Sequence, residues 1–303
     1  MTLRTDLEVA FGGVQLRAME LAIQAAAGLK EEIEGGVATS SRPGRKGLPL
    51  VGIHGFGGDK GTWLLMSALV PRARGITLVD LPGHGRSDDV PDDRCSVRDH
   101  AEAVLRAMDR TRVERAIICG NSMGGGVAMR LARSWPARVA GLVLVGSVGR
   151  DVHAGGARAW IDGDNPLIPR LEDVDRFMEL ALERPPPVGK AVIRHVITER
   201  AKRAEPLSRL FRGFVLGDGE RGVPGDLSAI AVPALVIHGE QDRIIDKRVA
   251  EDLVAQLPRA ELVIMRGVDH VLQLEAPRHT ARIIERFARR VETDQLDAGN
   301  RRR

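Results

Sequence analysis

The sequence predicts an α/β fold in which a mostly parallel sheet is flanked by helices. Short apolar runs of strand length alternate along the chain with segments whose apolar residues recur at helical spacing. Strands and helices that alternate in this way form parallel sheets with right-handed crossovers. The chain has 303 residues and its apolar segments are spread evenly, which indicates one domain with an insertion.

The first helical pattern covers residues 14–29, where Leu16 and Met19 begin an apolar series at spacings of three and four. A helix that docks on the body is favoured over a membrane-interface anchor, because its polar face lacks a cluster of lysine or arginine. A polar stretch with proline and glycine at 40–47 predicts a turn. We assign 1–47 to this helix and to first strands whose pattern is weak.

An apolar run at 48–53 predicts a buried strand that leads directly into HGFGGDKGTW. The glycines of this loop free the backbone to point N–H groups into a cavity, as an oxyanion-binding loop requires. Phe56 N–H is the candidate donor, and a glycine turn without chemistry is the alternative. The next strand is predicted at 75–80, and we interpret Asp80 and His84 after it as turn residues.

The alternation continues with a helix at 96–110, a strand at 115–119, a helix at 123–134 and a strand at 139–147. GNSMG, which fits GxSxG, separates the second of these strands from its helix. A strand turns into a helix around one residue only where neighbouring side chains are nearly absent. The two glycines would therefore expose Ser122 in a strained conformation, with the N–H of Met123 pointing at the same spot. A phosphate-binding turn and a turn without chemistry are the alternatives.

Residues 149–226 lack a buried-strand pattern and contain helical pieces and a PPP run. Such an insertion after the sixth strand predicts a helical cap whose apolar residues line a substrate pocket. Ordinary cap core is the alternative for each of them. The candidate pocket residues are Trp160, Leu167, Ile168, Phe177, Met178, Phe211 and Phe214.

The sheet pattern resumes after the insertion, so the core is assigned to 48–148 and 227–293. Asp242 follows the strand in ALVIHGEQDRIID and can reach back towards the serine loop; Glu240 and Asp246 compete for the same role. His270 follows the next strand. The chain order Ser122, Asp242, His270 is that of a nucleophile, orienting acid and base in one known arrangement of the catalytic triad.

HGFGG, DLPGHGRSD, GNSMGGG, HGEQDRIID and DHVLQLEAP resemble, in order, the motifs of the α/β-hydrolase superfamily over residues 48–290. HGFGGDKGTW and the segment DNPLIPRLEDVDRFMELALERPPPV most resemble bacterial lipases and monoacylglycerol-lipase-type enzymes. The chain departs from the family pattern at Asp269, where relatives often have glycine, and in its weak first strands. The resemblance implies an α/β-hydrolase fold with a mostly parallel sheet and a helical cap after the sixth strand.

The resemblance also implies a serine hydrolase of small hydrophobic carboxylic esters that needs no metal or cofactor. The catalytic residues would be Ser122, Asp242 and His270, with Phe56 and Met123 N–H groups forming the oxyanion hole. A carbon–carbon hydrolase of aromatic ring-cleavage products is the closest alternative, although its usual GPG-like oxyanion loop is absent here. A hydrolase-like ligand receptor is the second alternative.

Composition excludes several other classes. The net charge is +4, but the arginines are scattered and tyrosine is absent, which argues against nucleic-acid binding. The basic end 294–303 predicts a disordered tail. Cys95 and Cys119 are expected to be reduced thiols, the latter a buried apolar residue rather than a second nucleophile. No window approaches the roughly 20 apolar residues of a membrane span, so we expect a cytoplasmic protein; peripheral lipid contact and the oligomeric state stay open.

Overall fold

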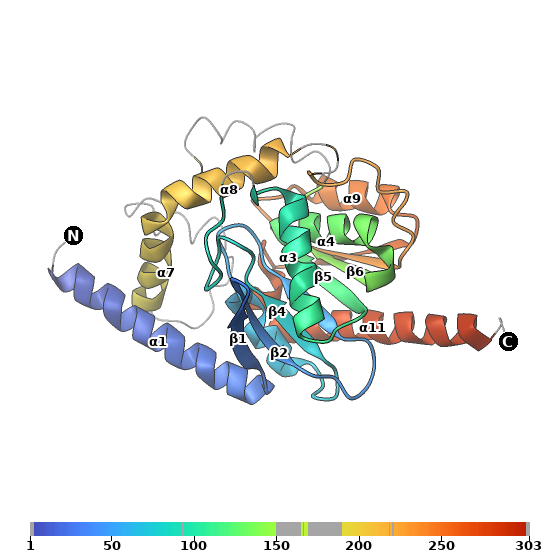
Figure 1. Ribbon diagram of the computed structural model, residues 1–303, viewed down its shortest axis with the longest axis horizontal. Helices are drawn as coiled ribbons and strands as arrows, with labels where there is room; N and C mark the ends of the chain where they lie inside the picture. The colour runs from blue at the N-terminus through green and yellow to red at the C-terminus, as the bar shows by residue number, and fades with distance from the viewer. Residues whose placement is uncertain are drawn as a thin grey trace.

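The computed structural model describes residues 3–91, 94–149, 165, 167–168, 190–217, 219 and 221–300. Eight strands of these ranges form one sheet in the order β1-β2-β4-β3-β5-β6-β7-β8 (Figure 1). Neighbouring strands from β4 to β8 run parallel, whereas β1 and β2 pair antiparallel, which confirms the mostly parallel α/β prediction. The strands are β1 Lys30–Glu34, β2 Val37–Arg42, β3 Leu50–Ile53, β4 Ile76–Val79, β5 Ala116–Asn121, β6 Val139–Val145, β7 Ala234–Gly239 and β8 Ala260–Met265.

Helices cover both faces of the sheet (Figure 1). Buried residues of α3, α4 and α9 belong to the core on one face, and those of α2 and α11 belong to the core on the other. The helices are α1 Leu3–Ala27, α2 Leu64–Leu69, α3 Val97–Arg110, α4 Met123–Ser134, α7 Lys190–Lys202, α8 Ala204–Leu216, α9 Lys247–Gln256, α10 Leu272–Glu275 and α11 Pro277–Asn300, with short 3-10 turns at Lys60–Trp63 and Pro136–Arg138.

The parallel strands are buried on both faces, and their side chains alternate between the two cores. In β5, Ile118 packs with the core under α3 and α4, whereas Ile117 and Cys119 pack with the core under α2 and α11. Parallel strands covered on both sides read as continuous apolar runs, which is why the sequence pattern located them well.

The N-terminal region differs from its prediction. The helix begins at Leu3 rather than at 14, and the stretch expected to be a turn from residue 40 begins inside strand β2. β2 is polar yet mostly buried between β1 and β4, and the Arg42 guanidinium at its end donates to the carbonyl oxygens of Ala27 at 2.5 Å and Val70 at 3.0 Å. Burial of this kind depends on partners far along the chain and leaves no apolar pattern.

The C-terminal end also differs from its prediction. Helix α11 continues through 294–300, most of the stretch expected to be a disordered tail. Its apolar residues Ile284, Ala288 and Val291 are buried at helical spacing, and no proline or glycine interrupts the chain between Pro277 and Gly299. Without such an interruption, the helix extends past its last buried contact.

The insertion between β6 and β7 contains helices α7 and α8 (Figure 1). α7 lies against α1, where Gly12 and Gly13 allow a close approach: a Cβ at Gly12 would lie 2.0 Å from the carbonyl oxygen of Ala191. Of the candidate pocket residues, Trp160, Phe177 and Met178 lie outside the described residues.

Candidate active site

The candidate site residues lie in loops that follow the carboxyl ends of parallel strands. Phe56 follows β3, Ser122 follows β5, Asp242 follows β7 and His270 follows β8. Because the carboxyl ends of parallel strands meet at one edge of the sheet, these loops share that edge. The topology alone therefore collects groups that are more than 200 residues apart in sequence.

Ser122 has φ 53° and ψ −119°, a left-handed backbone that a serine rarely adopts. The turn fits only because its flanking glycines lack side chains: a Cβ at Gly120 would lie 2.2 Å from the carbonyl oxygen of Gly124, and one at Gly124 would lie 2.5 Å from that of Ile53. Helix α4 begins at Met123, so N–H groups of its first turn have no acceptor within the helix. This is the local geometry that GNSMG predicts.

Several contacts bring the loops together around Ser122. A Cβ at Gly55 would lie 3.1 Å from the Cβ of Ser122, so the glycine-rich loop passes directly beside the serine. The Asn121 amide donates to the carbonyl oxygen of His270 at 3.4 Å. A Cβ at Gly146 would lie 2.9 Å from the same oxygen. The serine turn and the histidine loop are therefore neighbours.

Asp242 and His270 form the central polar pair of the site. His270 Nδ1 lies 2.8 Å from Asp242 Oδ2, and the other carboxylate oxygen accepts the N–H groups of Ile244 at 2.9 Å and Ile245 at 2.8 Å. Burial alone would raise the pKa of Asp242, but the hydrogen bond and the charge of His270 outweigh it and lower the pKa below its usual value. An ionised acceptor at Nδ1 puts the ring proton there and leaves Nε2 as the basic nitrogen of His270.

The two competing carboxylates have other surroundings. Glu240 is exposed, and Asp246 caps helix α9 by accepting the N–H of Arg248 at 2.9 Å. Among the three carboxylates that follow β7, Asp242 is thus the one that contacts the histidine.

Glu275 holds the histidine loop, a role that the sequence pattern did not reveal. Its carboxylate accepts the N–H of Asp269 at 2.9 Å and that of Val271 at 2.9 Å, on either side of His270. Asp269 is buried, and burial raises the pKa of its carboxyl group. The hydrogen bond from the N–H of Arg243 opposes this shift without cancelling it. The family departure at Asp269 therefore places a second carboxyl group directly before His270 in the chain, where it contacts Arg243.

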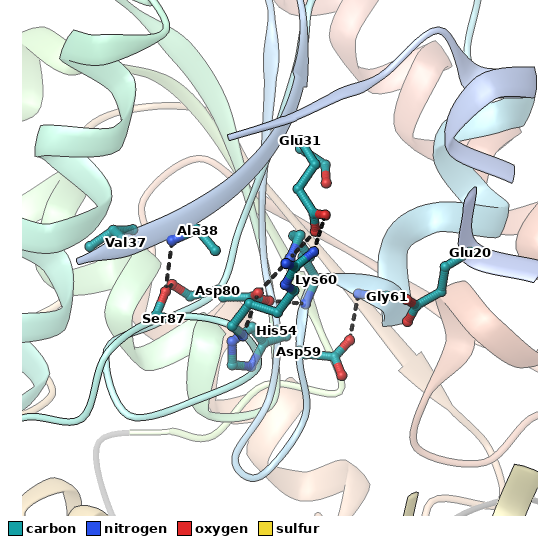
Figure 2. Close-up of polar contacts among 12 residues, drawn as sticks. Glu20, Glu31, Val37, Ala38, His54, Asp59, Lys60, Gly61, Asp80 and Ser87 are labelled. Carbon is teal, nitrogen blue, oxygen red and sulfur yellow. Dashed lines mark hydrogen bonds and ion pairs between the residues drawn. The ribbon is translucent and has the colours of Figure 1, made fainter. Parts of the chain in front are cut away.

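The glycine-rich loop is fixed at its first residue by His54. Its Nε2 accepts the N–H of Leu81 at 3.0 Å, so Nδ1 carries the proton and donates to the carbonyl oxygen of Gly55 at 2.7 Å. The loop is fixed again at Lys60, whose N–H donates to Asp80 at 2.7 Å and whose ammonium lies 2.5 Å from the same carboxylate (Figure 2).

Asp80 is therefore more than the turn residue that the sequence suggested. Figure 2 shows its carboxylate between the Lys60 backbone and the Lys60 side chain, whose ammonium also lies 3.0 Å from Glu31 on β1. Burial alone would lower the pKa of Lys60, but the two carboxylates outweigh it and raise the pKa, so the ammonium keeps its charge. The glycine-rich loop is thus anchored on the sheet through Asp80.

The insertion between β6 and β7 reaches the same loop through Arg200 of α7. Its Nη2 donates to the carbonyl oxygen of Phe56 at 3.1 Å and to that of Leu167 at 3.3 Å. Burial lowers the pKa of Arg200 to about 10, while Asp59 opposes the shift, so the side chain stays charged at neutral pH. Gly57 makes the approach feasible, because a Cβ there would lie 2.0 Å from Nη2.

The described pocket candidates separate into two groups. Phe211 of α8 meets Phe56 edge-on at 5.2 Å between ring centroids, and Leu167 is held near the same loop through Arg200. Phe214 faces Gly126 of helix α4 instead, and Ile168 packs with a small cluster around Cys95. The structure therefore brings Phe211 and Leu167 to the glycine-rich loop, places Phe214 against helix α4, and packs Ile168 on the same small cluster as Phe56.

A stack of buried histidines lies behind Phe56. The ring centroid of His84 lies 5.8 Å from that of Phe56, 5.2 Å from that of His54 and 6.2 Å from that of His100. Burial lowers the pKa of all three rings, that of His100 to about 4. Within the described part of the chain, neither ring nitrogen of His100 has a hydrogen-bond partner.

We expect acid to destabilise the fold through these rings. A histidine whose pKa is lower in the folded than in the unfolded protein binds its proton on unfolding, so stability is full above about pH 6.5 and declines towards about pH 4. A shift from 6.5 to about 4 at His100 corresponds to about 3 kcal/mol. Urea unfolding across this pH range measures the decline, and His100→Leu should make stability less dependent on pH.

His279→Asn, at an exposed position of α11, is the control. An equal reduction of the pH dependence by both variants would contradict the assignment of the acid effect to the buried His100 ring.

Two other sequence expectations concern reactive groups. Burial raises the pKa of Cys119 to about 12, so this residue is a thiol and not a second nucleophile. Among the described residues, no group of three or more His, Cys, Asp or Glu side chains is arranged to hold a metal ion. None of the helices described is both long and apolar enough to cross a bilayer.

A family model described as "Alpha/beta hydrolase family" matches residues 50–283. The chain is 29% identical to 2-hydroxymuconate semialdehyde hydrolase of Pseudomonas putida over 88% of this chain and 95% of that protein. It is 26% identical to Lipase 3 of Moraxella sp. (strain TA144) over 80% of this chain and 77% of that protein. It is also 31% identical, over 77% of its length, to the dihydrolipoyllysine-residue acetyltransferase component of the acetoin cleaving system of Pseudomonas putida, of which it spans only 61%.

Among solved structures, the chain resembles a bacterial membrane phospholipase A described as a virulence factor. The TM-score is 0.83 at 26% identity, with 93% of each chain covered.

Proposed function

The chain belongs to the alpha/beta hydrolase family, and on that basis we propose that it cleaves carboxylic esters through an acyl-enzyme on Ser122. The observation that carries the proposal is the pair formed by His270 Nδ1 and Asp242 Oδ2 at 2.8 Å, beside a serine held at φ 53°. A base oriented by an ionised acid near a half-buried serine hydroxyl is the arrangement needed for nucleophilic catalysis at neutral pH.

In the first half of the reaction, Ser122 Oγ attacks the ester carbonyl carbon while His270 Nε2 takes the hydroxyl proton. The carbonyl oxygen becomes an oxyanion and accepts the N–H groups of Phe56 and Met123. The carbon–oxygen bond to the alcohol then breaks, and His270 gives its proton to the departing alkoxide. Asp242 holds the ring and stabilises its cation throughout.

In the second half, water attacks the acyl-enzyme with His270 Nε2 again acting as base. The new tetrahedral intermediate collapses, the carboxylic acid leaves and Ser122 Oγ regains the proton. The cap supplies an apolar surface at the oxyanion loop through Phe211, which favours a hydrophobic acyl or alcohol group.

Similarity to a lipase and to a phospholipase A supports the choice of esters as substrates. Similarity to 2-hydroxymuconate semialdehyde hydrolase over almost the whole chain favours a second candidate, hydrolysis of a carbon–carbon bond in a ring-cleavage product. The loop HGFGG, without a GPG-like run, makes esters the first choice.

Initial rates on p-nitrophenyl esters and monoacylglycerols of increasing chain length test the proposal. We expect turnover that depends on Ser122, with an optimum chain length that reflects the size of the pocket. Rapid cleavage of a ring-cleavage dienoate together with inertness to every ester would establish the second candidate instead. Tight binding of ligand without turnover of either class would indicate a receptor.

We expect Arg200 to act as a positioning residue for the oxyanion loop. Arg200→Lys loses the planar donor group that contacts the carbonyls of Phe56 and Leu167, so kcat should fall about tenfold to a hundredfold with little change in KM. Arg203→Lys is the matched control, because Arg203 binds the carbonyl of Gly83 at 2.9 Å and not the loop. Steady-state kinetics with thermal unfolding separate this role from simple destabilisation. Equal kcat values for the two variants would refute it.

A further inference from the structure

The outer face of helix α1 is apolar, which reverses the usual arrangement of a surface helix. Between residues 10 and 26, a stretch described in full, Gln15 is the one polar residue among the exposed positions. The polar residues Arg17, Glu20 and Gln24 turn towards the body instead. The exposed apolar positions, called here the α1 outer face, are Ala10, Phe11, Val14, Ala18, Met19, Leu21, Ala22, Ala25 and Ala26.

Inward contacts explain this reversal. Arg17 pairs with Glu31 at 2.8 Å, and Glu20 and Gln24 line a polar cavity of about 160 Å³ next to the Lys60 cluster. These contacts fix the rotation of α1, so its apolar side chains cannot turn inward without breaking the half-buried ion pair between Arg17 and Glu31. Phe11, Val14 and Leu21 consequently remain 60%, 69% and 49% exposed. Contiguous exposed apolar surface of this kind marks an interaction site.

Basic side chains stand at the carboxyl end of the α1 outer face. Exposed Arg72 donates to the carbonyl oxygen of Ala26. Exposed Arg45 and Lys46 belong to the adjacent turn, where their N–H groups donate to the carbonyl of Ala73 at 2.7 and 3.0 Å. At the start of strand β1, the charges of Lys30 and Glu32 balance each other because the two side chains pair at 2.6 Å. An apolar strip bordered by cations is complementary to lipid chains bordered by phosphate groups.

We propose that the α1 outer face docks on the surface of an anionic lipid bilayer, with α1 lying in the interface plane. A second copy of the chain fits the face less well. The α1 outer face spans residues 10–26, a helical length of about 26 Å at a width of about 10 Å, so the strip covers about 260 Å², a third of the roughly 800 Å² that each partner of a stable interface buries. Docking on a bilayer does not require a minimum buried area of this kind. Because α1 packs on α7, docking would bring the cap to the lipid (Figure 1).

Flotation of the full chain with vesicles tests the docking. We expect binding to vesicles of phosphatidylcholine mixed with phosphatidylglycerol, and weaker binding to phosphatidylcholine alone. Val14→Gln combined with Leu21→Gln should lower the partition coefficient on the order of a hundredfold, because two apolar side chains no longer enter the interface. Leu296→Gln is the matched control, since Leu296 is 70% exposed on α11. Arg45→Gln with Lys46→Gln should remove the preference for anionic vesicles.

Several outcomes would overturn the proposal. Absence of binding to both kinds of vesicle would do so, as would equal partition of the Val14/Leu21 double variant and the wild type. A dimer in light scattering that the same double variant dissociates would assign the face to a second copy. Turnover of water-soluble esters should be unchanged in every variant, which keeps this test independent of the proposed catalytic function.

Discussion

Ser122→Ala should lower ester turnover by about 10⁶-fold and leave the fold intact. Triad members act as a unit, so removal of the nucleophile leaves only the contribution of the oxyanion donors and substrate binding. Alanine has the same Cβ as serine, and the backbone strain at φ 53° is therefore unchanged. The free energy of unfolding should consequently stay close to that of the wild type.

Rates on the preferred ester and urea unfolding curves of the same preparation check this expectation. Cys119→Ala is the matched control, because Cys119 is the nearby thiol and its buried position should make it dispensable for turnover. Residual Ser122→Ala activity within tenfold of wild type would mean that another group carries the acyl chain. A large loss of stability would mean that the hydroxyl supports the fold.

Asp242→Asn should lower kcat by about 10⁴-fold. The amide can donate a hydrogen bond to Nδ1 of His270, which would move the ring proton to Nε2 and remove the base. The charge that stabilises the imidazolium is lost as well. Asp242 also contributes stability above its unfolded pKa of about 3.9, and this contribution disappears as pH falls through its lowered folded pKa.

Asp246→Asn is the control for the acid, because asparagine caps a helix as well as aspartate does and α9 should be unaffected. The two variants are compared by kcat over a range of pH. If Asp246→Asn or Glu240→Gln lost activity while Asp242→Asn retained it, the orienting acid would have to be reassigned.

Local patterns made much of this fold predictable. Helix α4 and strand β5 were located to within two residues, because an apolar run, two glycines and a helical series follow one another without interruption. The neighbourhood of Ser122 and the Asp242–His270 contact follow from the same patterns, since parallel strands deliver their carboxyl ends to one edge. Asp242 stood out only as one of three candidates, and its contact with His270 distinguishes it geometrically.

The remaining features depend on contacts between residues far apart in the sequence, which no local sequence pattern indicates. The Arg42 guanidinium at the end of β2 binds carbonyls of distant segments, Glu275 supports His270 through backbone N–H groups, and Arg200 reaches the glycine-rich loop from helix α7 of the insertion. Each of these side chains is an ordinary charged residue in its own segment. Their function in the fold is set by tertiary contacts, so sequence spacing alone could not identify them.

The hairpin of β1 and β2, which the sequence indicated only weakly, also affects how the protein behaves in concentrated solution. β1 forms one border of the sheet and consists of Lys30, Glu31, Glu32, Ile33 and Glu34. A border strand offers unpaired backbone groups to any other chain, and adjacent charges oppose such pairing through repulsion and the cost of dehydration. The apolar strands inside the sheet are thereby separated from intermolecular strand addition on this side, so β1 and β2 act as a barrier to aggregation.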